Sequence, residues 1–558
     1  MSERKRILLL LGVAVLVYAN TLLSSFAMDD ELYIFRNSTV TSLSLSKVFE
    51  PTKANNVFRP ITFGSLALNW ALGSVHPFGY HLFNLLLNAA VTVLVYLVLR
   101  NLLEPLAQGT IVAWVAALLF AVHPIHTEAV AAIVGRSELL AAGFLLGAWL
   151  LHLHDRPVLV LICFILALLS KESAVVFVPL VVAGDYARGK LKPLSRYGWI
   201  TGMAVAYLVV LWNVQGGRFG EKAINYLDNP LAYLPARLRI PNALRIAWKY
   251  LGLQFYPGTL SCDYSYNAIL LYANWHRTIL AVVAFVLVMT LWLWALYTKR
   301  KEWFLAGAIY LAGFSITANV LVPTGTIMAE RLAYLPSVGF CLFIALIWIC
   351  LEERNRKVAW VVLSLIVLAL ATRTVVRNRD WHDNFRLFTA GVRAVPGSAK
   401  MHAGLGEQYM ERGQLDEARN ELGIALRIFP MYPQAIGVAG VVESHAGHDQ
   451  EALHLFEKEL SMTGKDNIDY PAVQVTLAAQ LMKLKQNDKA LGILDEVIAS
   501  APGNARAWSN RAVIRFQRGE QATARSDAEI ALRLDPNSAQ AQDLLSVLNS
   551  SGPPVRQP

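Results

Sequence analysis

Three adjacent carboxylates, Asp29, Asp30 and Glu31, directly follow the first apolar segment of the chain. An ionisable side chain beside a segment of membrane-spanning length is costly to keep there and is by default a functional hypothesis. One interpretation is a general base or a metal ligand held next to a substrate in the membrane. The other interpretation is a solvated helix cap, and the motif alone leaves both open.

Other ionisable residues collect where later apolar segments begin or end. Guanidinium groups bind phosphate oxygens through two parallel hydrogen bonds, and lysine adds a point charge. Together with carboxylates, these residue types suit an anionic phosphate group and a hydroxyl nucleophile. The alternative is that Lys171 pairs with Glu172, and Glu330 with Arg331. The candidate donor-phosphate and substrate-binding residues are Arg59, His81, His123, His126, Glu128, Arg136, Glu138, Lys171, Glu172, Glu330 and Arg331.

The segment HPIHTE contains His123, His126 and Glu128, residue types that also occur in metal sites. On a helix, spacings of three and two residues do not bring all three side chains to one face. We therefore favour hydrogen bonding within an active-site loop over a zinc site. The sequence leaves open whether a divalent metal such as Mg²⁺ or Mn²⁺ binds at the carboxylates after the first apolar segment.

The chain that carries these residues has the composition of a membrane protein. Of its 558 residues, 55% are hydrophobic and 16% are charged, and the mean hydropathy is +0.42. Soluble globular proteins carry about 25% charged residues, so a wholly soluble enzyme and a disordered chain are both excluded. A spanning helix needs about 20 mostly apolar residues. Eleven candidates lie at 7–27, 80–100, 111–128, 138–154, 157–170, 173–185, 199–214, 277–298, 303–322, 332–351 and 357–375.

Lysine and arginine in the loops predict the orientation of these spans. They also account for the net charge of +10, so no nucleic-acid partner is needed to explain it. With the N-terminus inside, the basic clusters at 2–6, 186–196, 298–303 and 352–357 all fall on the cytoplasmic side. The opposite side then holds the carboxylates and everything after residue 375. The basic segment 373–386 does not follow this rule. The first apolar segment can also be interpreted as a cleaved signal peptide.

The C-terminal part is a predicted repeat array. Ala418 and Ala452 are 34 residues apart, as are Ala490 and Ala524, which is the tetratricopeptide period. Small residues at this spacing let two helices cross closely, and four such repeats exceed the three or so that a stable stack needs. Such arrays present a concave surface to a protein partner. We predict a membrane domain at 1–375, a linker at 376–398, repeats at 399–545 and a flexible tail at 546–558.

These motifs, in this order, resemble a known family. FAMDDELYIFRN, HPIHTEAVAAIVGR, SKES and AERLAYLPSVGF, followed by the repeats, are similar to the transmembrane-and-tetratricopeptide O-mannosyltransferases of the GT-C superfamily. The resemblance implies an all-α, multi-spanning GT-C membrane domain followed by an α-solenoid. It also implies transfer of mannose from dolichyl phosphate mannose to Ser or Thr hydroxyls of proteins. An aspartate of the first outer loop acts as base or binds a metal in that superfamily, and its register favours Asp30 over Asp29.

The short loops and four repeats resemble a prokaryotic relative. That implies a bacterial inner membrane, repeats in the periplasm and an undecaprenyl donor; a eukaryotic member would lie in the endoplasmic reticulum membrane with luminal repeats. Other hypotheses are a GT-C transferase that modifies a lipid or glycan, a non-catalytic membrane scaffold, and a transporter. The expected partners are the bilayer, a polyprenyl-phosphate sugar, and an acceptor or partner protein bound by the repeats.

Overall fold

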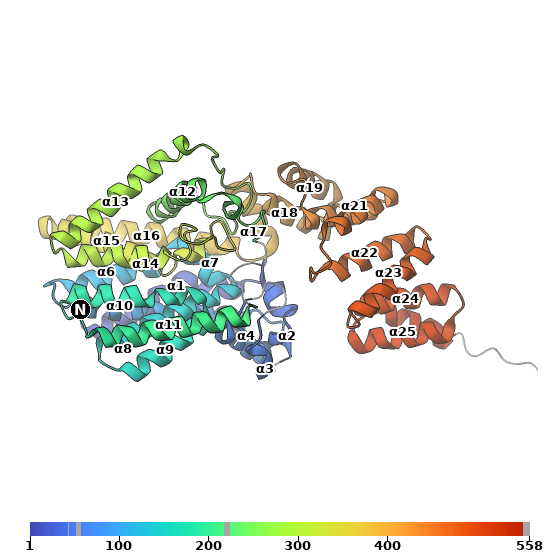
Figure 1. Ribbon diagram of the computed structural model, residues 1–558, viewed down its shortest axis with the longest axis horizontal. Helices are drawn as coiled ribbons and strands as arrows, with labels where there is room; N and C mark the ends of the chain where they lie inside the picture. The colour runs from blue at the N-terminus through green and yellow to red at the C-terminus, as the bar shows by residue number, and fades with distance from the viewer. Residues whose placement is uncertain (43, 52–56, 217–223, 551–558) are drawn as a thin grey trace, which may run out of the picture. The chain divides into compact units, whose positions relative to one another are not determined.

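The structure is a computed structural model that describes residues 1–42, 44–51, 57–216 and 224–550. Within these ranges every regular element is helical, which confirms the predicted all-α class. The chain divides into two compact units, Met1–Met401 and His402–Pro558. Each unit is described separately below (Figure 1).

The first unit is a bundle of long apolar helices. Six of them are long and apolar enough to cross a membrane, and a seventh is obtained if a pair bent by 54° counts as one span. Each of the eleven predicted spans contains a helix, but the exact number of crossings stays a prediction. The helices are α1 (Glu3–Tyr18), α2 (Ser38–Thr41), α3 (Leu45–Val48), α4 (Pro60–Gly73), α5 (Phe78–Leu102), α6 (Gly109–Val122), α7 (Thr127–Ala131), α8 (Arg136–Leu153), α9 (Pro157–Ser170), α10 (Phe177–Arg188), α11 (Leu194–Val214), α12 (Ala236–Phe255), α13 (Ile279–Tyr297), α14 (Lys301–Phe314), α15 (Ser337–Arg354), α16 (Arg356–Asp380) and α17 (Asn384–Ala394).

Helix α6 lies at the centre of this bundle, packed by α1, α5 and α15. Its sequence is apolar on all sides, as expected for a helix without a solvent face. It ends where His123 adopts an extended backbone and Pro124 begins a new turn. Proline cannot donate to the preceding turn, so the chain bends there and re-enters as α7. The bend places the HPIHTE segment inside the unit.

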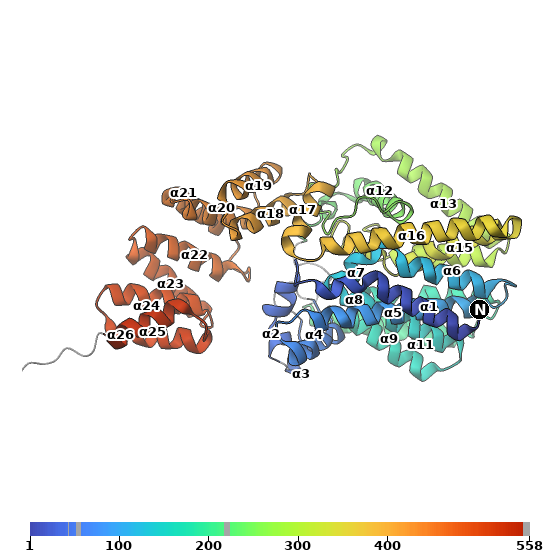
Figure 2. The ribbon, with the colours of Figure 1, turned by 180° about the vertical axis from the view of Figure 1, so that it is seen from behind.

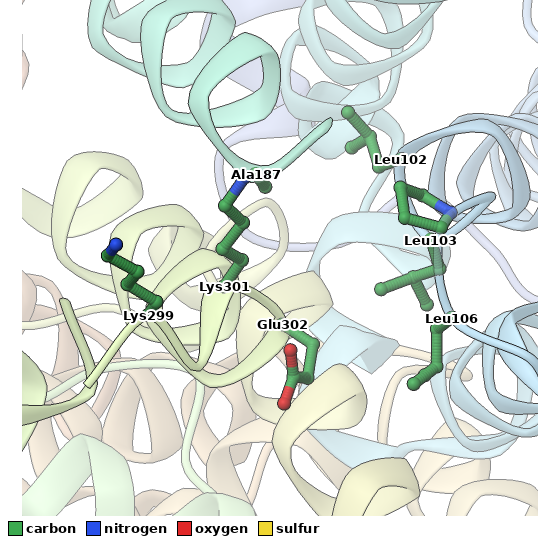
Figure 3. A pocket seen from close by; sticks show the side chains of 8 residues that line it. Leu102, Leu103, Leu106, Ala187, Lys299, Lys301 and Glu302 are labelled. Atoms are coloured by element: carbon green, nitrogen blue, oxygen red, sulfur yellow. The ribbon is translucent and has the colours of Figure 1, made fainter. Parts of the chain in front are cut away.

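Basic clusters of the sequence gather at one end of the bundle. The N-terminus lies at one end, whereas α2, α3 and α17 lie at the other, as both views show (Figure 2). At the N-terminal end Arg100 pairs with Glu3, Arg188 with Glu104, and Lys192 with Asp155. A cavity of about 120 Å³ beside them is lined by Leu102, Ala187, Lys299 and Lys301 (Figure 3). Three of the four predicted basic clusters therefore meet at this end.

The predicted linker 376–398 is mostly helical and belongs to the first unit. Helix α16 continues to Asp380, and α17 follows after a short turn. Trp381, Leu387 and Val395 are buried in the core that also contains Met401. The many charges of this segment suggested a polar linker between the two domains, but the apolar residues of α17 fall on one face of an amphipathic helix. That apolar face packs against the core of the first unit.

The second unit is a series of helix pairs, which confirms the tetratricopeptide array. The four spaced alanines Ala418, Ala452, Ala490 and Ala524 are all completely buried. The helices are α18 (Ala399–Glu411), which begins in the first unit, α19 (Leu415–Ile428), α20 (Pro433–His445), α21 (Asp449–Met462), α22 (Tyr470–Lys483), α23 (Asn487–Ser500), α24 (Ala505–Gln517), α25 (Gln521–Leu534) and α26 (Ala539–Ser550).

The end of the chain differs from the expected flexible tail at 546–558. Residues 546–550 complete α26, and Leu548 is buried against the preceding pair. The rest of the predicted tail, 551–558, lies outside the described residues.

Candidate active site

Asp30 is the most enclosed carboxylate of the first loop, with 1% of its surface exposed. Its Oδ2 accepts a hydrogen bond from the Ala27 backbone N–H at 2.9 Å, and its Oδ1 accepts one from Val134 at 3.3 Å. Burial raises the pKa of Asp30 to about 7, although these two backbone donors act in the opposite direction. Both oxygens are therefore occupied, one by a donor within the first loop and one by the turn that precedes α8.

Its two neighbours have different surroundings. Glu31 is exposed and pairs with Arg36 at 2.9 Å, so it faces away from the other candidates. Asp29 is half-buried, and in the part of the chain that the structure describes its carboxylate makes no hydrogen bond or ion pair. Among the three, Asp29 alone combines an accessible position with unoccupied oxygens.

Glu128 and Arg331 join two motifs that are far apart in the sequence. The Arg331 backbone N–H donates to Glu128 Oε2 at 2.9 Å, and its guanidinium pairs with Oε1. The Glu128 side chain is 1% exposed and that of Arg331 is 32% exposed. Burial would lower the pKa of Arg331, but the charges of Glu128, Asp29 and Glu138 raise it. Arg331 therefore lies within the electrostatic reach of Asp29 and presents part of its guanidinium outward.

Two more ion pairs extend this cluster. Arg59 binds Glu172 through two parallel hydrogen bonds of 3.0 and 2.7 Å, and Lys171 pairs with Glu138. Burial would raise the pKa of Glu172, but the adjacent Arg59 guanidinium lowers it to about 2. Lys171 and Glu172 thus pair with other partners rather than with each other.

Arg136 and His81 were both expected to bind phosphate or substrate, but both side chains are buried inside the protein. Arg136 is fully buried, and its guanidinium donates to Asn84 Oδ1 at 2.8 Å and to the Tyr80 and Ser65 carbonyls. These bonds tie α8 to α4 and α5 and leave the group enclosed by protein. His81 is also buried, and no carboxylate among the described residues hydrogen-bonds to it.

The two histidines of HPIHTE hold the bend in place. His123 Nε2 is 2.9 Å from the Gln254 carbonyl, and His126 Nε2 is 2.7 Å from Ser337 Oγ. Both side chains therefore hydrogen-bond to other segments of the first unit. No group of three potential ligands of the His, Cys, Asp or Glu type occurs within the described ranges. Asp29, Asp30 and Glu31 each have different surroundings.

Glu330 does not pair with the adjacent Arg331. Its Oε1 accepts hydrogen bonds of 2.6 Å from the Ser261 N–H and the Tyr264 hydroxyl, and its Oε2 is 3.9 Å from Arg377. Burial raises the pKa of Glu330 to about 7, although Arg377 acts in the opposite direction. Glu330 therefore anchors the backbone from which Arg331 projects.

Arg377 was missed as a functional candidate, although the sequence contained a signal for it. It lies in the basic segment 373–386, which did not fit the predicted orientation. The structure shows that Arg377 is buried between Glu330 and Asp380, and that Arg373 donates to the carbonyls of Pro257 and Gly258. Arg377 thus faces Glu330, and Arg373 binds the segment that follows α12, so both arginines have structural partners.

Comparisons with known proteins identify matches for both parts of the chain. Residues 7–388 match the family model described as EpsG family, and residues 476–539 match the tetratricopeptide repeat model. Protein O-mannosyl-transferase TMTC3 of Homo sapiens is 24% identical, covering 95% of this chain and 68% of that protein. TMTC3 of Mus musculus is 26% identical over 96% of this chain, and protein O-mannosyl-transferase F38B6.6 of Caenorhabditis elegans is 28% identical over 77%. The chain covers 64% of the length of each of these last two relatives.

A solved structure, the crystal structure of MamA, covers 28% of this chain and 89% of its own at 19% identity, with a TM-score of 0.24. The names of the three relatives confirm the resemblance that the motifs predicted.

Proposed function

Since the chain belongs to the EpsG family and its relatives are protein O-mannosyl-transferases, we propose that it is an integral membrane glycosyltransferase. It transfers a sugar, mannose in this proposal, from a polyprenyl-phosphate donor to Ser or Thr hydroxyls of proteins. The observation that carries the proposal is the half-buried Asp29, whose carboxylate makes no hydrogen bond or ion pair among the described residues and whose charge acts on the partly exposed Arg331. A base and a phosphate-binding cation are the two groups that this reaction needs together.

Asp29 is the general base in this proposal. Transfer requires the acceptor hydroxyl to lose its proton while the bond between the anomeric carbon and the phosphate oxygen breaks. A positioned carboxylate contributes about 10²–10⁴-fold to such a step. Asp30 is less suited than the sequence register suggested, because both of its oxygens accept backbone hydrogen bonds. Asp30 instead positions the loop that carries Asp29.

Arg331 and Arg59 contact the phosphate of the donor. Their side chains are 32% and 20% exposed, whereas Lys171 and Arg136 are enclosed. Each of these two arginines already binds a carboxylate that orients its guanidinium, and each keeps part of its surface open. As the phosphate leaves, it gains negative charge, which such donors stabilise in a site from which water is excluded.

The side of the membrane on which this reaction takes place is inferred from the basic clusters at one end of the bundle. The basic end is cytoplasmic, so the end with α2, α3 and α17 faces the opposite compartment. The C-terminal repeats follow α17 and lie in that compartment, where they bind acceptor proteins. This compartment is the periplasm in a bacterium, with an undecaprenyl donor, or the endoplasmic reticulum lumen in a eukaryote, with a dolichyl donor.

The test is transfer of radiolabelled mannose from dolichyl- or undecaprenyl-phosphate mannose in membranes that contain the protein. The products are separated into protein and lipid fractions, and the Asp29→Asn variant is the matched control. Label in the protein fraction that depends on Asp29 supports the proposal. Label confined to the lipid fraction supports a GT-C transferase with a lipid acceptor, and no Asp29-dependent label in either fraction contradicts glycosyl transfer.

A further inference from the structure

A second cavity, of about 280 Å³, lies between α12 and the segment that follows residue 267. It is lined by Arg245 and Lys249 from α12 and by Leu270 and Tyr272 from the opposite wall, with Ile246, Ala268 and Ile269 between them. No residue of this cavity was a candidate in the sequence, and none belongs to the cluster around Asp29. The cavity therefore needs an explanation of its own.

Neither cation of this cavity forms an ion pair with a carboxylate among the described residues. Among the described residues, Lys249 forms no ion pair or hydrogen bond, and its ammonium lies 4.7 Å from the centre of the Tyr264 ring. The Arg245 guanidinium lies 4.4 Å from the Tyr272 ring and donates to the Leu270 carbonyl, while its buried Nε–H has no acceptor. Burial lowers the pKa of Lys249, the charge of Glu330 acts in the opposite direction, and the charge of Arg245 lowers it further. Half-buried cations without counter-ions make the cavity a site for an anion.

An apolar surface begins directly beside the two cations. Trp248 Nε1 of α12 donates to the Ala281 carbonyl at 3.0 Å, which fixes α12 against the start of α13. Helix α13 has a mean hydropathy of 2.7 over its spanning window, of which only 6% is buried in the protein. Leu280 and Leu287 are 80% and 59% exposed. A long apolar chain attached to an anion in the cavity would therefore run along α13 within the membrane.

The number of charges selects one kind of lipid anion. A phosphate monoester carries about −1.5 to −2 at neutral pH, because its second pKa is about 6. A phosphodiester carries only a single negative charge. Two cations with no carboxylate partner among the described residues match the monoester better. The sugar-linked donor is a phosphodiester, as are ordinary phospholipid headgroups. By this match of charges, neither is the preferred occupant of the cavity.

We propose that this cavity binds the phosphate monoester of a polyprenyl phosphate, the carrier that remains after sugar transfer. The inference rests on the proposed function. In that reaction the bond from the anomeric carbon to the phosphate oxygen breaks, and a bond from the same carbon to the acceptor oxygen forms. The phosphate keeps the bonding electrons, and the hydroxyl proton goes to the base, so the diester donor becomes a monoester. The cavity is a product site beside the reacting centre.

Contacts between α12 and the motif that contains Arg331 support this position. The Tyr250 hydroxyl, next to Lys249 in sequence, donates to the Ala329 carbonyl and accepts from the Ala329 N–H, both at 2.9 Å. The charge of Glu330 also acts on Lys249. The cavity is thus connected to the backbone that precedes Arg331, while its cations remain separate from the Asp29 cluster.

The experiment measures binding to the purified full-length protein in detergent. The ligands are farnesyl phosphate as the monoester, phosphatidylglycerol as a phosphodiester, farnesol without phosphate, and inorganic phosphate. Lys249→Met and Arg245→Met remove the proposed contacts. Arg237→Met is the matched control, because Arg237 is an exposed cation of the same helix that does not line the cavity.

We expect farnesyl phosphate to bind at least about 10-fold more tightly than phosphatidylglycerol or inorganic phosphate. Loss of one charged contact should weaken monoester binding at least about 10-fold in Lys249→Met, with the control unchanged. Equal affinity for monoester and diester, or unchanged monoester affinity in both cavity variants, would overturn the inference. Tight binding of inorganic phosphate alone would also overturn it, since that would show an anion site without lipid recognition.

Transfer kinetics distinguish this inference from the proposed function. In the wild-type protein, added polyprenyl phosphate should inhibit transfer, and Lys249→Met should relieve this inhibition with little change in the KM for the donor. Normal transfer with unaltered product inhibition in that variant rejects the cavity and leaves the proposed function intact. Selective monoester binding by a wild-type protein that transfers no sugar rejects the proposed function instead.

Discussion

Arg331 and Glu128 are 203 residues apart in the chain, and they are joined by an ion pair of their side chains and by a hydrogen bond from the Arg331 backbone N–H. The pair connects the turn after α6 to the turn before α15. Because the Glu128 carboxylate is almost fully buried, it holds the guanidinium in one orientation while a third of the Arg331 side chain stays exposed. Arg331 is thereby oriented in advance towards a ligand at the end of the bundle that contains Asp29.

Replacing Asp29 by Asn should reduce turnover at least about 10²-fold with little change in donor affinity, because it removes the proposed base while preserving shape. Transfer at saturating donor, together with donor binding, measures this. Glu31→Gln is the matched control and should transfer normally, since Glu31 pairs with Arg36 away from the cluster. Normal turnover by the Asp29→Asn protein would remove Asp29 from the chemical step.

Replacing Asp30 by Asn should change the pH dependence of stability. The pKa of Asp30 is raised from 3.8 in the unfolded chain to about 7 in the folded protein. The folded protein therefore holds a proton that the unfolded chain releases, and this contribution to stability is lost as the pH rises from about 4 to about 7.

Thermal unfolding in detergent should show a flatter pH profile for Asp30→Asn than for the wild type. Glu31→Gln is the control and should keep the wild-type profile, because Glu31 is exposed and pairs with Arg36. A profile for Asp30→Asn that follows the wild type across this pH range would mean that Asp30 is charged throughout.

Replacing Arg331 by Lys should weaken donor binding or turnover by about 10-fold or more. Lysine keeps the charge beside Glu128 but lacks the planar fork, so the fold should be retained. Arg36→Lys is the control, because Arg36 is exposed and pairs with Glu31, which lies outside the cluster around Arg331. Wild-type donor kinetics in a folded Arg331→Lys protein would exclude Arg331 from phosphate contact.

A topology reporter that is active only outside the cytoplasm should be active when fused after Pro558. The reason is that the basic end of the bundle is opposite to the end with α17, after which the repeats follow. The same reporter fused after Arg354, in the basic turn between α15 and α16, should be inactive. The reverse pattern, with both fusions expressed, would invert the orientation.

Removing residues 414–558 should leave donor binding intact and reduce transfer to protein acceptors. The cut keeps Ser398, Lys400 and Met401, which contact Asp263, Asp228 and Cys262 in the first unit. Donor binding and transfer to a short Ser/Thr peptide are compared with transfer to a folded protein. Loss of donor binding in a truncated protein that stays monodisperse would show that the repeats support the membrane unit itself.

Much of this protein could be predicted from its sequence because the relevant signals are local. Long apolar runs predict helices in a membrane, and alanines at a fixed spacing predict helix pairs that cross closely. The motifs also indicated that Glu128, Glu138, Lys171, Glu172 and Arg331 belong to one region, and the structure brings them into neighbouring ion pairs.

What only the tertiary structure decided is which partner each polar group meets. Asp29 and Asp30 are adjacent and chemically identical, yet the Val134 N–H, 104 residues further along the chain, occupies an oxygen of Asp30 and none of Asp29. Arg136 has the same side chain as Arg331, but it is fully buried and bonded to α4 and α5. The cations of α12 lie in a segment for which the sequence predicted neither a span nor a motif, so their cavity had no sequence signal. Periodicity reports the face on which a residue lies, whereas hydrogen bonding and enclosure depend on segments that meet only in the folded chain.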